Sequence, residues 1–179
     1  AGLLMRRYLH EYQAPADALA GFSLTAHANA VHNSNAFLRR TVSLEEYRQA
    51  PRDSDPLNVY DAAPLADGAA ALILARREVL AASADRPLIR VAGSSVAIGA
   101  LALHDQPDLL GLSAAEESAR RAFHQAGVTP EEIDLFELHD AYSIYAALAL
   151  EASGFAGRGQ GWRLAAEGQI GLQARIPVA

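Results

Sequence analysis

The stretch Ile133-Asp134-Leu135-Phe136-Glu137-Leu138-His139-Asp140-Ala141-Tyr142-Ser143 indicates the fold more clearly than any other part of the sequence. The alternation in residues 133–138 is typical of a strand, and the alanine-rich residues after Tyr142 are typical of a helix. A polar cluster would then follow the carboxyl end of a strand, where α/β proteins gather ligands and catalytic groups. The alternative is structural, with Asp140 capping the helix and His139 satisfied beside it. Spacing alone leaves both open.

Predicted strands and helices alternate through the second half of the chain. Residues 67–75 are a run of small apolar side chains, which predicts a buried strand, and residues 88–103 predict a second strand with a bend. Residues 113–126 predict an amphipathic helix with Ser113 as N-cap, Glu116 completing a capping box and Gly127 ending the helix. The helix after Tyr142 is expected to end at Gly154. This order predicts an α/β layered domain.

The first part of the chain is expected to contain helices and loops. Residues 1–13 predict a helix, and its apolar face consists of Leu3, Leu4, Tyr8 and Leu9. Residues 23–36 are dense in histidine and asparagine and predict either a helix or a packed loop. Ser43 and Glu46 form a capping-box pattern, which starts a short helix that ends near Pro51.

Composition narrows the class of protein. The 179 residues are 51% hydrophobic and 20% charged, which is typical of a globular chain. A formal net charge of −6 gives no electrostatic footprint for nucleic acid. No apolar segment approaches the roughly 20 residues that a bilayer requires, and the first residues lack the order of a signal peptide. We therefore expect a cytoplasmic protein with no membrane span and no nucleic-acid partner.

Several common sites are disfavoured by the residues present. The sequence contains no cysteine, which excludes disulfides, thiolate metal sites and a cysteine nucleophile within these residues. The pairs His27/His32 and His139/Asp140 lack the three-ligand pattern of catalytic zinc, so no metal site is expected. The glycine-rich residues 157–161 lack the lysine and hydroxyl of a P-loop and are interpreted as a flexible connection. The chain starts at Ala1 and stops just after a strand-like segment, so we expect a fragment.

The motif at residues 134–143 resembles the thiolase superfamily, in particular the sterol-carrier-protein type and related acetyl-CoA acetyltransferases. Those proteins carry His-Asp-Ala/Cys-Phe at this place. Residues 55–71 are similar to the stretch between the family's loop domain and the last strand of its first half. Residues 161–164 and 175–178 are similar to the segment that leads to the family's Gly-His-Pro motif. The resemblance covers essentially the whole chain, in order.

The resemblance implies an α/β thiolase-like layered fold that is incomplete here. Residues 1–75 would form the loop region and final strand of the N-terminal half, and residues 76–179 a truncated C-terminal half. The implied chemistry is Claisen condensation or thiolysis of acyl-CoA thioesters, with coenzyme A thioester as substrate and no further cofactor. The family's two cysteines and its Gly-His-Pro histidine are absent from these residues. This chain alone is therefore expected to be inactive.

The resemblance also implies roles for three residues. His139 takes the position of the family's oxyanion-hole residue, where a neutral imidazole can donate a hydrogen bond. Tyr142 stands where the family has a phenylalanine that lines the acyl pocket. Ser113 falls near a family serine that contacts the pantetheine arm, although helix capping would explain a serine there equally well.

Two other functions are compatible with the same motif. One is a thiolase-fold aldolase acting on CoA-linked side chains, in which tyrosines transfer protons, and Tyr142 is the residue that favours it. The other is a non-catalytic thiolase-like scaffold subunit. Homo-oligomers are usual in the family, and a small zinc-ribbon/OB-fold acyl-CoA-binding protein is a possible partner.

Overall fold

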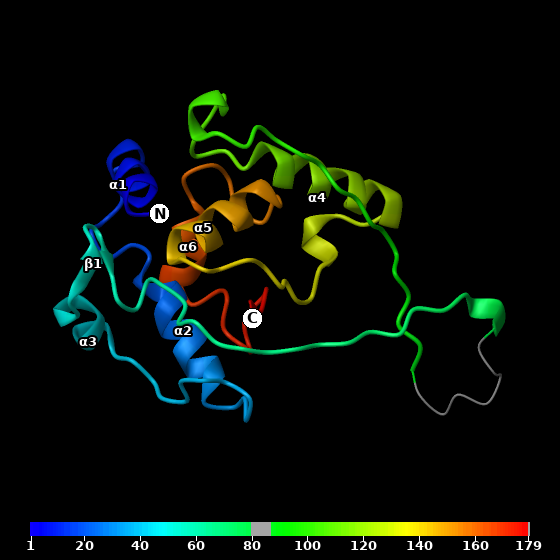
Figure 1. Ribbon diagram of the computed structural model, residues 1–179, viewed down its shortest axis with the longest axis horizontal. Coiled ribbons are helices and arrows are strands. Elements are labelled where there is room, and N and C mark those ends of the chain that lie inside the picture. The colour runs from blue at the N-terminus through cyan, green and yellow to red at the C-terminus, as the bar shows by residue number, and fades with distance from the viewer. Residues whose placement is uncertain (80–86, 179) are drawn as a thin grey trace.

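The computed structural model describes residues 1–79 and 87–178. Helices dominate it, and an extended arm leaves the helical body and returns to it (Figure 1). In chain order the elements are α1 (Gly2–Glu11), α2 (Ala20–Ala30), α3 (Leu44–Gln49), β1 (Arg52–Ser54), β2 (Leu57–Asn58), η1 (Arg77–Val79), η2 (Leu103–Asp105), α4 (Ser113–Ala126), η3 (Pro130–Glu132), α5 (Ser143–Ala152) and α6 (Gly161–Ala166). The strands β1 and β2 form an antiparallel hairpin.

The core is built around α5. This helix is apolar on nearly every face, and such helices are stable only when they are buried on all sides. Ile144, Leu148 and Leu150 are buried in the same cluster as Met5 and Tyr8 of α1. Helices α2 and α6 complete the layer around α5 (Figure 1). The core therefore lies directly behind the helix that starts at the motif 139–143.

Two of the predicted capping signals are confirmed, the capping box at Ser43 and the end of α4 at Gly127. The hydroxyl of Ser43 accepts a hydrogen bond from the Glu46 N–H at 3.1 Å, and the Glu46 carboxylate accepts one from the Ser43 N–H at 2.7 Å. Gly127 ends α4 with φ at +71°, in the left-handed region that glycine adopts without strain. Ser43 and Glu46 are three residues apart, and Gly127 directly follows α4. Both signals are local, which is why the sequence predicts them.

Two details of the predicted helices are wrong. Leu3, which the pattern predicts on the apolar face of α1, is 81% exposed, and Met5 is buried in the core instead. Leu112, not Ser113, is the N-cap of α4, and no side chain caps this end. The Leu112 carbonyl accepts the hydrogen bond from the Glu116 N–H at 2.9 Å. Because the helix starts one residue earlier than a serine cap requires, the Ser113 side chain lies within the first turn.

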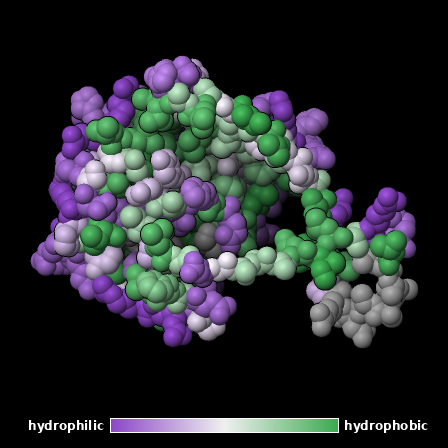
Figure 2. Space-filling view, viewed as in Figure 1, coloured by the Kyte–Doolittle hydropathy of each residue, from purple (hydrophilic) through white to green (hydrophobic). Residues whose placement is uncertain are grey.

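The predicted strands at 67–75 and 88–103 are also wrong. Neither segment forms a strand, and Leu103 already belongs to η2. Their large apolar side chains are exposed, for example Ile73 at 97% and Ile98 at 93%. A strand needs a hydrogen-bonded neighbour, and within the described residues neither segment has one. Residues 93–95 instead lie along α4, where the Ser118 hydroxyl donates to the Ser95 carbonyl at 2.9 Å. The exposed arm appears as a largely green extension in Figure 2.

The predicted strand at 133–138 is reduced to a single pairing. Phe136 forms a parallel bridge with Val178, and its N–H donates to the Pro177 carbonyl at 3.0 Å. The neighbouring Leu135 is 55% exposed. The alternating pattern places Phe136 and Leu138 against the core correctly. Within the described residues, however, the segment lacks further strands to extend its ladder.

Candidate functional site

Backbone hydrogen bonds hold the motif 139–143 between two distant segments. The Ala63 N–H donates to the Ala141 carbonyl at 3.0 Å, and Ala62 forms an antiparallel bridge with Tyr142. The Ser143 N–H donates to the Asp61 carbonyl at 2.9 Å. On the other side of the motif, Phe136 forms a parallel bridge with Val178, and its N–H donates to the Pro177 carbonyl. The motif is therefore fixed on both sides just before α5 begins.

The alternative in which Asp140 caps this helix is wrong. Tyr142 is the N-cap of α5, in extended conformation, and its side chain makes no capping bond. Asp140 lies two residues outside that position and is exposed. Instead, the Asp61 carbonyl accepts the N–H of Ser143, the first helical residue. The helix start is therefore capped from a segment about 80 residues away, and Asp140 lines an adjacent pocket.

A buried carboxylate lies beneath the motif. Asp61 is 2% exposed, and its Oδ1 accepts hydrogen bonds from the Ser143 hydroxyl at 2.6 Å and the Tyr47 hydroxyl at 2.8 Å. Its Oδ2 accepts one from the Asn58 N–H at 2.9 Å. Burial raises the pKa of Tyr47, and the charge on Asp61 raises it further, so the phenol stays a donor. The sequence gives no signal for this network, because Asp61 and Ser143 are far apart along the chain.

His139 and Tyr142 lie on the exposed side of the same motif. The His139 side chain is exposed, and its ring centroid lies 6.4 Å from that of Tyr145. Tyr142 is half-buried and packs edge-on against Tyr145 at 5.8 Å. Tyr145 thus lies against both predicted site residues, one turn into α5. The structure brings His139 and Tyr142 together on one surface.

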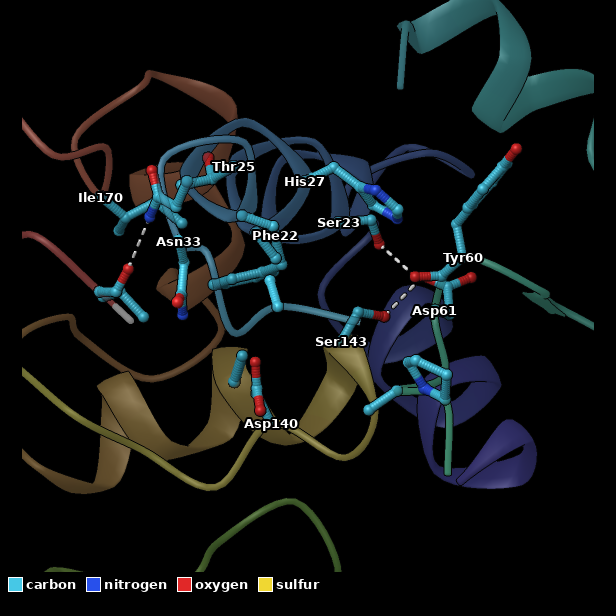
Figure 3. A pocket seen from close by; sticks show the side chains of 18 of the residues that line it. Phe22, Ser23, Thr25, His27, Asn33, Tyr60, Asp61, Asp140, Ser143 and Ile170 are labelled. Atoms are coloured by element: carbon cyan, nitrogen blue, oxygen red, sulfur yellow. Dashed lines mark hydrogen bonds between the residues drawn. The ribbon is translucent and has the colours of Figure 1, made fainter. Parts of the chain in front are cut away.

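A pocket of about 510 Å³ opens beside the motif, between α2, residues 60–64, the start of α5 and residues 170–178 (Figure 3). Its lining is mainly apolar, with Asp140 and Ser143 on the side of α5. The Ser23 hydroxyl donates to the Tyr60 carbonyl at 2.8 Å on the opposite side. Figure 2 shows a hollow in the helical body, lined largely by apolar residues. The pocket has room for a small molecule or for a packed segment of protein.

Ser113 lies in a different hollow. It is exposed at the start of α4 and lines a shallow depression with residues 96–99 and Arg121. Of the motif 139–143, Asp140 and Ser143 line the first pocket. The predicted site residues His139, Tyr142 and Ser113 are not among its lining residues. The predicted contact between Ser113 and a pantetheine arm stays a prediction, as do the roles of His139 and Tyr142.

The glycine-rich residues 157–161 form a structured turn and not a flexible connection. The Glu151 carboxylate accepts hydrogen bonds from the N–H groups of Gly159 at 2.9 Å and Gly161 at 2.8 Å. It also accepts the Tyr8 hydroxyl at 2.5 Å. Burial, together with this bond to Glu151, raises the pKa of Tyr8. One carboxylate therefore joins α1, α5 and the start of α6.

Within residues 1–79 and 87–178, no three histidine, aspartate or glutamate side chains gather as a metal site would require. Over the same residues, no helix combines the length and the apolar character needed to cross a bilayer.

Comparisons with known proteins show that the chain is similar to thiolase-like proteins. Residues 95–179 match the thiolase C-terminal domain-like family. The predicted resemblance to the thiolase superfamily is confirmed, and so is the predicted fold class, because the solved structure of the Ltp2-ChsH2(DUF35) aldolase superposes with a TM-score of 0.84 over 99% of this chain. That structure shares 20% sequence identity, and the chain covers 47% of it, so this likeness shows the fold alone.

Two curated relatives are more similar in sequence. The acetyl-CoA acetyltransferase of Methanothermobacter thermautotrophicus is 37% identical over 98% of this chain. The benzoylsuccinyl-CoA thiolase subunit BbsB of Thauera aromatica is 31% identical over 91% of it. The chain spans about half the length of the curated relatives it matches, 46% and 42% respectively.

Proposed function

We propose that this chain forms part of a thiolase-like acyl-CoA C-acyltransferase, which catalyses Claisen condensation or thiolysis of acyl-CoA thioesters. The observation that carries the proposal is the 37% identity, over 98% of the chain, to an acetyl-CoA acetyltransferase. The motif 139–143 supports it, because the fold fixes this turn firmly at a helix start. Since the 179 residues contain no cysteine, the acylated nucleophile would come from outside them.

In this proposal, His139 donates a hydrogen bond to the thioester oxygen as negative charge develops on it. An exposed imidazole on a firmly held turn suits that role, because an oxyanion donor must be in place before the reaction begins. Tyr142 lines the acyl end of the substrate, and its packing on Tyr145 fixes its ring. Ser113 contacts the pantetheine arm from α4. The split into a first part at 1–75 and a second at 76–179 belongs to the same proposal.

The proposed substrates are coenzyme A thioesters, and no further cofactor is required for this chemistry. We also propose that the protein assembles with further subunits, either copies of itself or a small zinc-ribbon/OB-fold acyl-CoA-binding protein. Two similarities support an assembly. BbsB is named as a subunit, and the structural neighbour is an Ltp2-ChsH2 pair.

The test is an assay of the complete gene product that contains this chain. A 3-oxoacyl-CoA is supplied with and without free coenzyme A, and cleavage is followed by the loss of the substrate's absorbance. Cleavage that requires free coenzyme A supports the acyltransferase. Cleavage of a 3-hydroxyacyl-CoA without coenzyme A, with release of an aldehyde or ketone, would favour the aldolase instead. Tyr142 is the residue whose hydroxyl would serve that second reaction.

A further inference from the structure

We propose that Asp61 is a positioning residue for the motif 139–143, which it orients through Ser143; this inference rests on the proposed function. Asp61 binds Ser143 twice. Its backbone carbonyl accepts the Ser143 N–H at 2.9 Å, and its carboxylate accepts the Ser143 hydroxyl at 2.6 Å. Figure 3 shows the Ser143 hydroxyl directed at the Asp61 carboxylate.

The two bonds belong to a short ladder between segments far apart in sequence. Beside them, the Ala63 N–H donates to the Ala141 carbonyl, and Ala62 pairs with Tyr142. The ladder covers residues 141–143 and begins two residues after His139. A shift of Ser143 would therefore shift the backbone that carries His139 and Tyr142.

The carboxylate itself is anchored from α3 and β2. Tyr47 of α3 donates to Oδ1, and the Asn58 N–H of β2 donates to Oδ2. In addition, the Asn58 side chain donates to the Tyr47 carbonyl at 3.1 Å, which fixes the two donors relative to each other. Through Asp61, α3 and β2 thus help to fix the position of Ser143, in addition to its own helix α5.

Asp61 borders the pocket, but its burial and its hydrogen bonds favour a positioning role over direct contact with substrate. Its side chain is buried, and three donors already occupy its two oxygens. Within residues 1–79 and 87–178, no arginine or histidine forms an ion pair with it. A buried charge that is held only by neutral donors is costly to keep. The network therefore suits a requirement for fixed geometry better than a requirement for stability.

The kinetic consequence follows from the role proposed for His139. A donor that acts mainly in the transition state affects kcat, whereas ground-state binding of the thioester affects KM. A displacement of about 1 Å in a catalytic group can cost about a hundredfold in rate. Loss of the Ser143 hydroxyl removes one of its two bonds to Asp61. We expect a fall in kcat of about tenfold with little change in KM.

The experiment uses the complete gene product with Ser143→Ala and Asp61→Asn. The matched control is Ser118→Ala, which removes a serine hydroxyl that donates one hydrogen bond on α4, away from the motif. Both test variants are expected to lower kcat and leave KM within about twofold, while the control stays at the wild-type rate. In a His139→Ala background, Ser143→Ala is expected to cause no further loss, because its effect passes through His139.

A second measurement reads the position of His139 without any reaction. The imidazole ¹³C resonance of His139, identified by its loss in His139→Ala, is expected to shift or broaden in Ser143→Ala and not in Ser118→Ala. An unchanged resonance overturns the inference, and so does a wild-type kcat in Ser143→Ala. A wild-type protein without coenzyme A-dependent cleavage would instead contradict the proposed function, and the resonance would then decide on Asp61 by itself.

Discussion

Removal of the Glu151 carboxylate is expected to destabilise the protein by about 3 kcal/mol. The carboxylate accepts three hydrogen bonds, from the Tyr8 hydroxyl and from the N–H groups of Gly159 and Gly161. Both glycines are buried, so Glu151→Ala leaves two buried N–H groups without an acceptor. Each such group costs about 1–3 kcal/mol, and the three losses overlap because they share one partner.

Urea unfolding measures this loss through the fluorescence of Trp162, the single tryptophan of the sequence, which lies next to Gly161 in α6. Glu167→Ala is the matched control, because the Glu167 carboxylate is exposed and, among the residues that the structure describes, accepts a side-chain hydrogen bond only from Gln169. The control is expected to change the free energy of unfolding by less than about 0.5 kcal/mol. A loss below about 1 kcal/mol in Glu151→Ala would refute the reasoning that this carboxylate organises the turn.

Three further predictions concern local geometry and pH. Gly161→Ala should unfold at a lower urea concentration than wild type, since its methyl group would collide with a backbone carbonyl oxygen of α5. Burial and the neighbouring Asp61 raise the pKa of Tyr47 above its ordinary 10.0. The stabilising contribution of the neutral phenol is therefore complete below pH 10 and declines as the pH rises further. The free energy of unfolding, measured across that pH range, should therefore fall less steeply in Tyr47→Phe than in the wild-type protein. Ser43→Ala should cost about 1 kcal/mol, because Ser43 forms a capping box, whereas Ser113→Ala should cost less than about 0.5 kcal/mol. Equal losses in the two serine variants, measured by thermal unfolding, would contradict this assignment of caps.

The sequence predicts helices well because their signals are local. The bounds of α4 and its end at Gly127 follow from periodicity and a left-handed glycine. The strands at 67–75 and 88–103 depend on neighbours that the pattern does not identify. Their composition shows that they could be buried, but not what buries them. Ile73 and Ile98 are exposed, because within the described residues no strand lies beside either segment.

The candidate site likewise combines residues that a local motif indicates with a residue that only a distant contact brings in. The spacing after an apolar run indicates only a polar cluster, and the resemblance of the motif to the thiolase superfamily singles out His139 and Tyr142 within it. Asp61 is not readable, because its partner Ser143 lies 82 residues further along the chain. Asp140 precedes the helix and is a cap candidate by sequence, yet a carbonyl from Asp61 provides the bond at that end. Local patterns locate the site, and distant contacts hold it in place.

The central claim is that His139 is an oxyanion donor in an acyl-CoA acyltransferase, and the turnover of His139→Ala tests it most directly. The measurement compares kcat for coenzyme A-dependent cleavage of a 3-oxoacyl-CoA by the complete gene product, with and without the substitution. Because the imidazole is exposed, the variant is expected to keep the wild-type unfolding midpoint. Its kcat is expected to fall by about a hundredfold or more. Wild-type turnover in His139→Ala would contradict the claim.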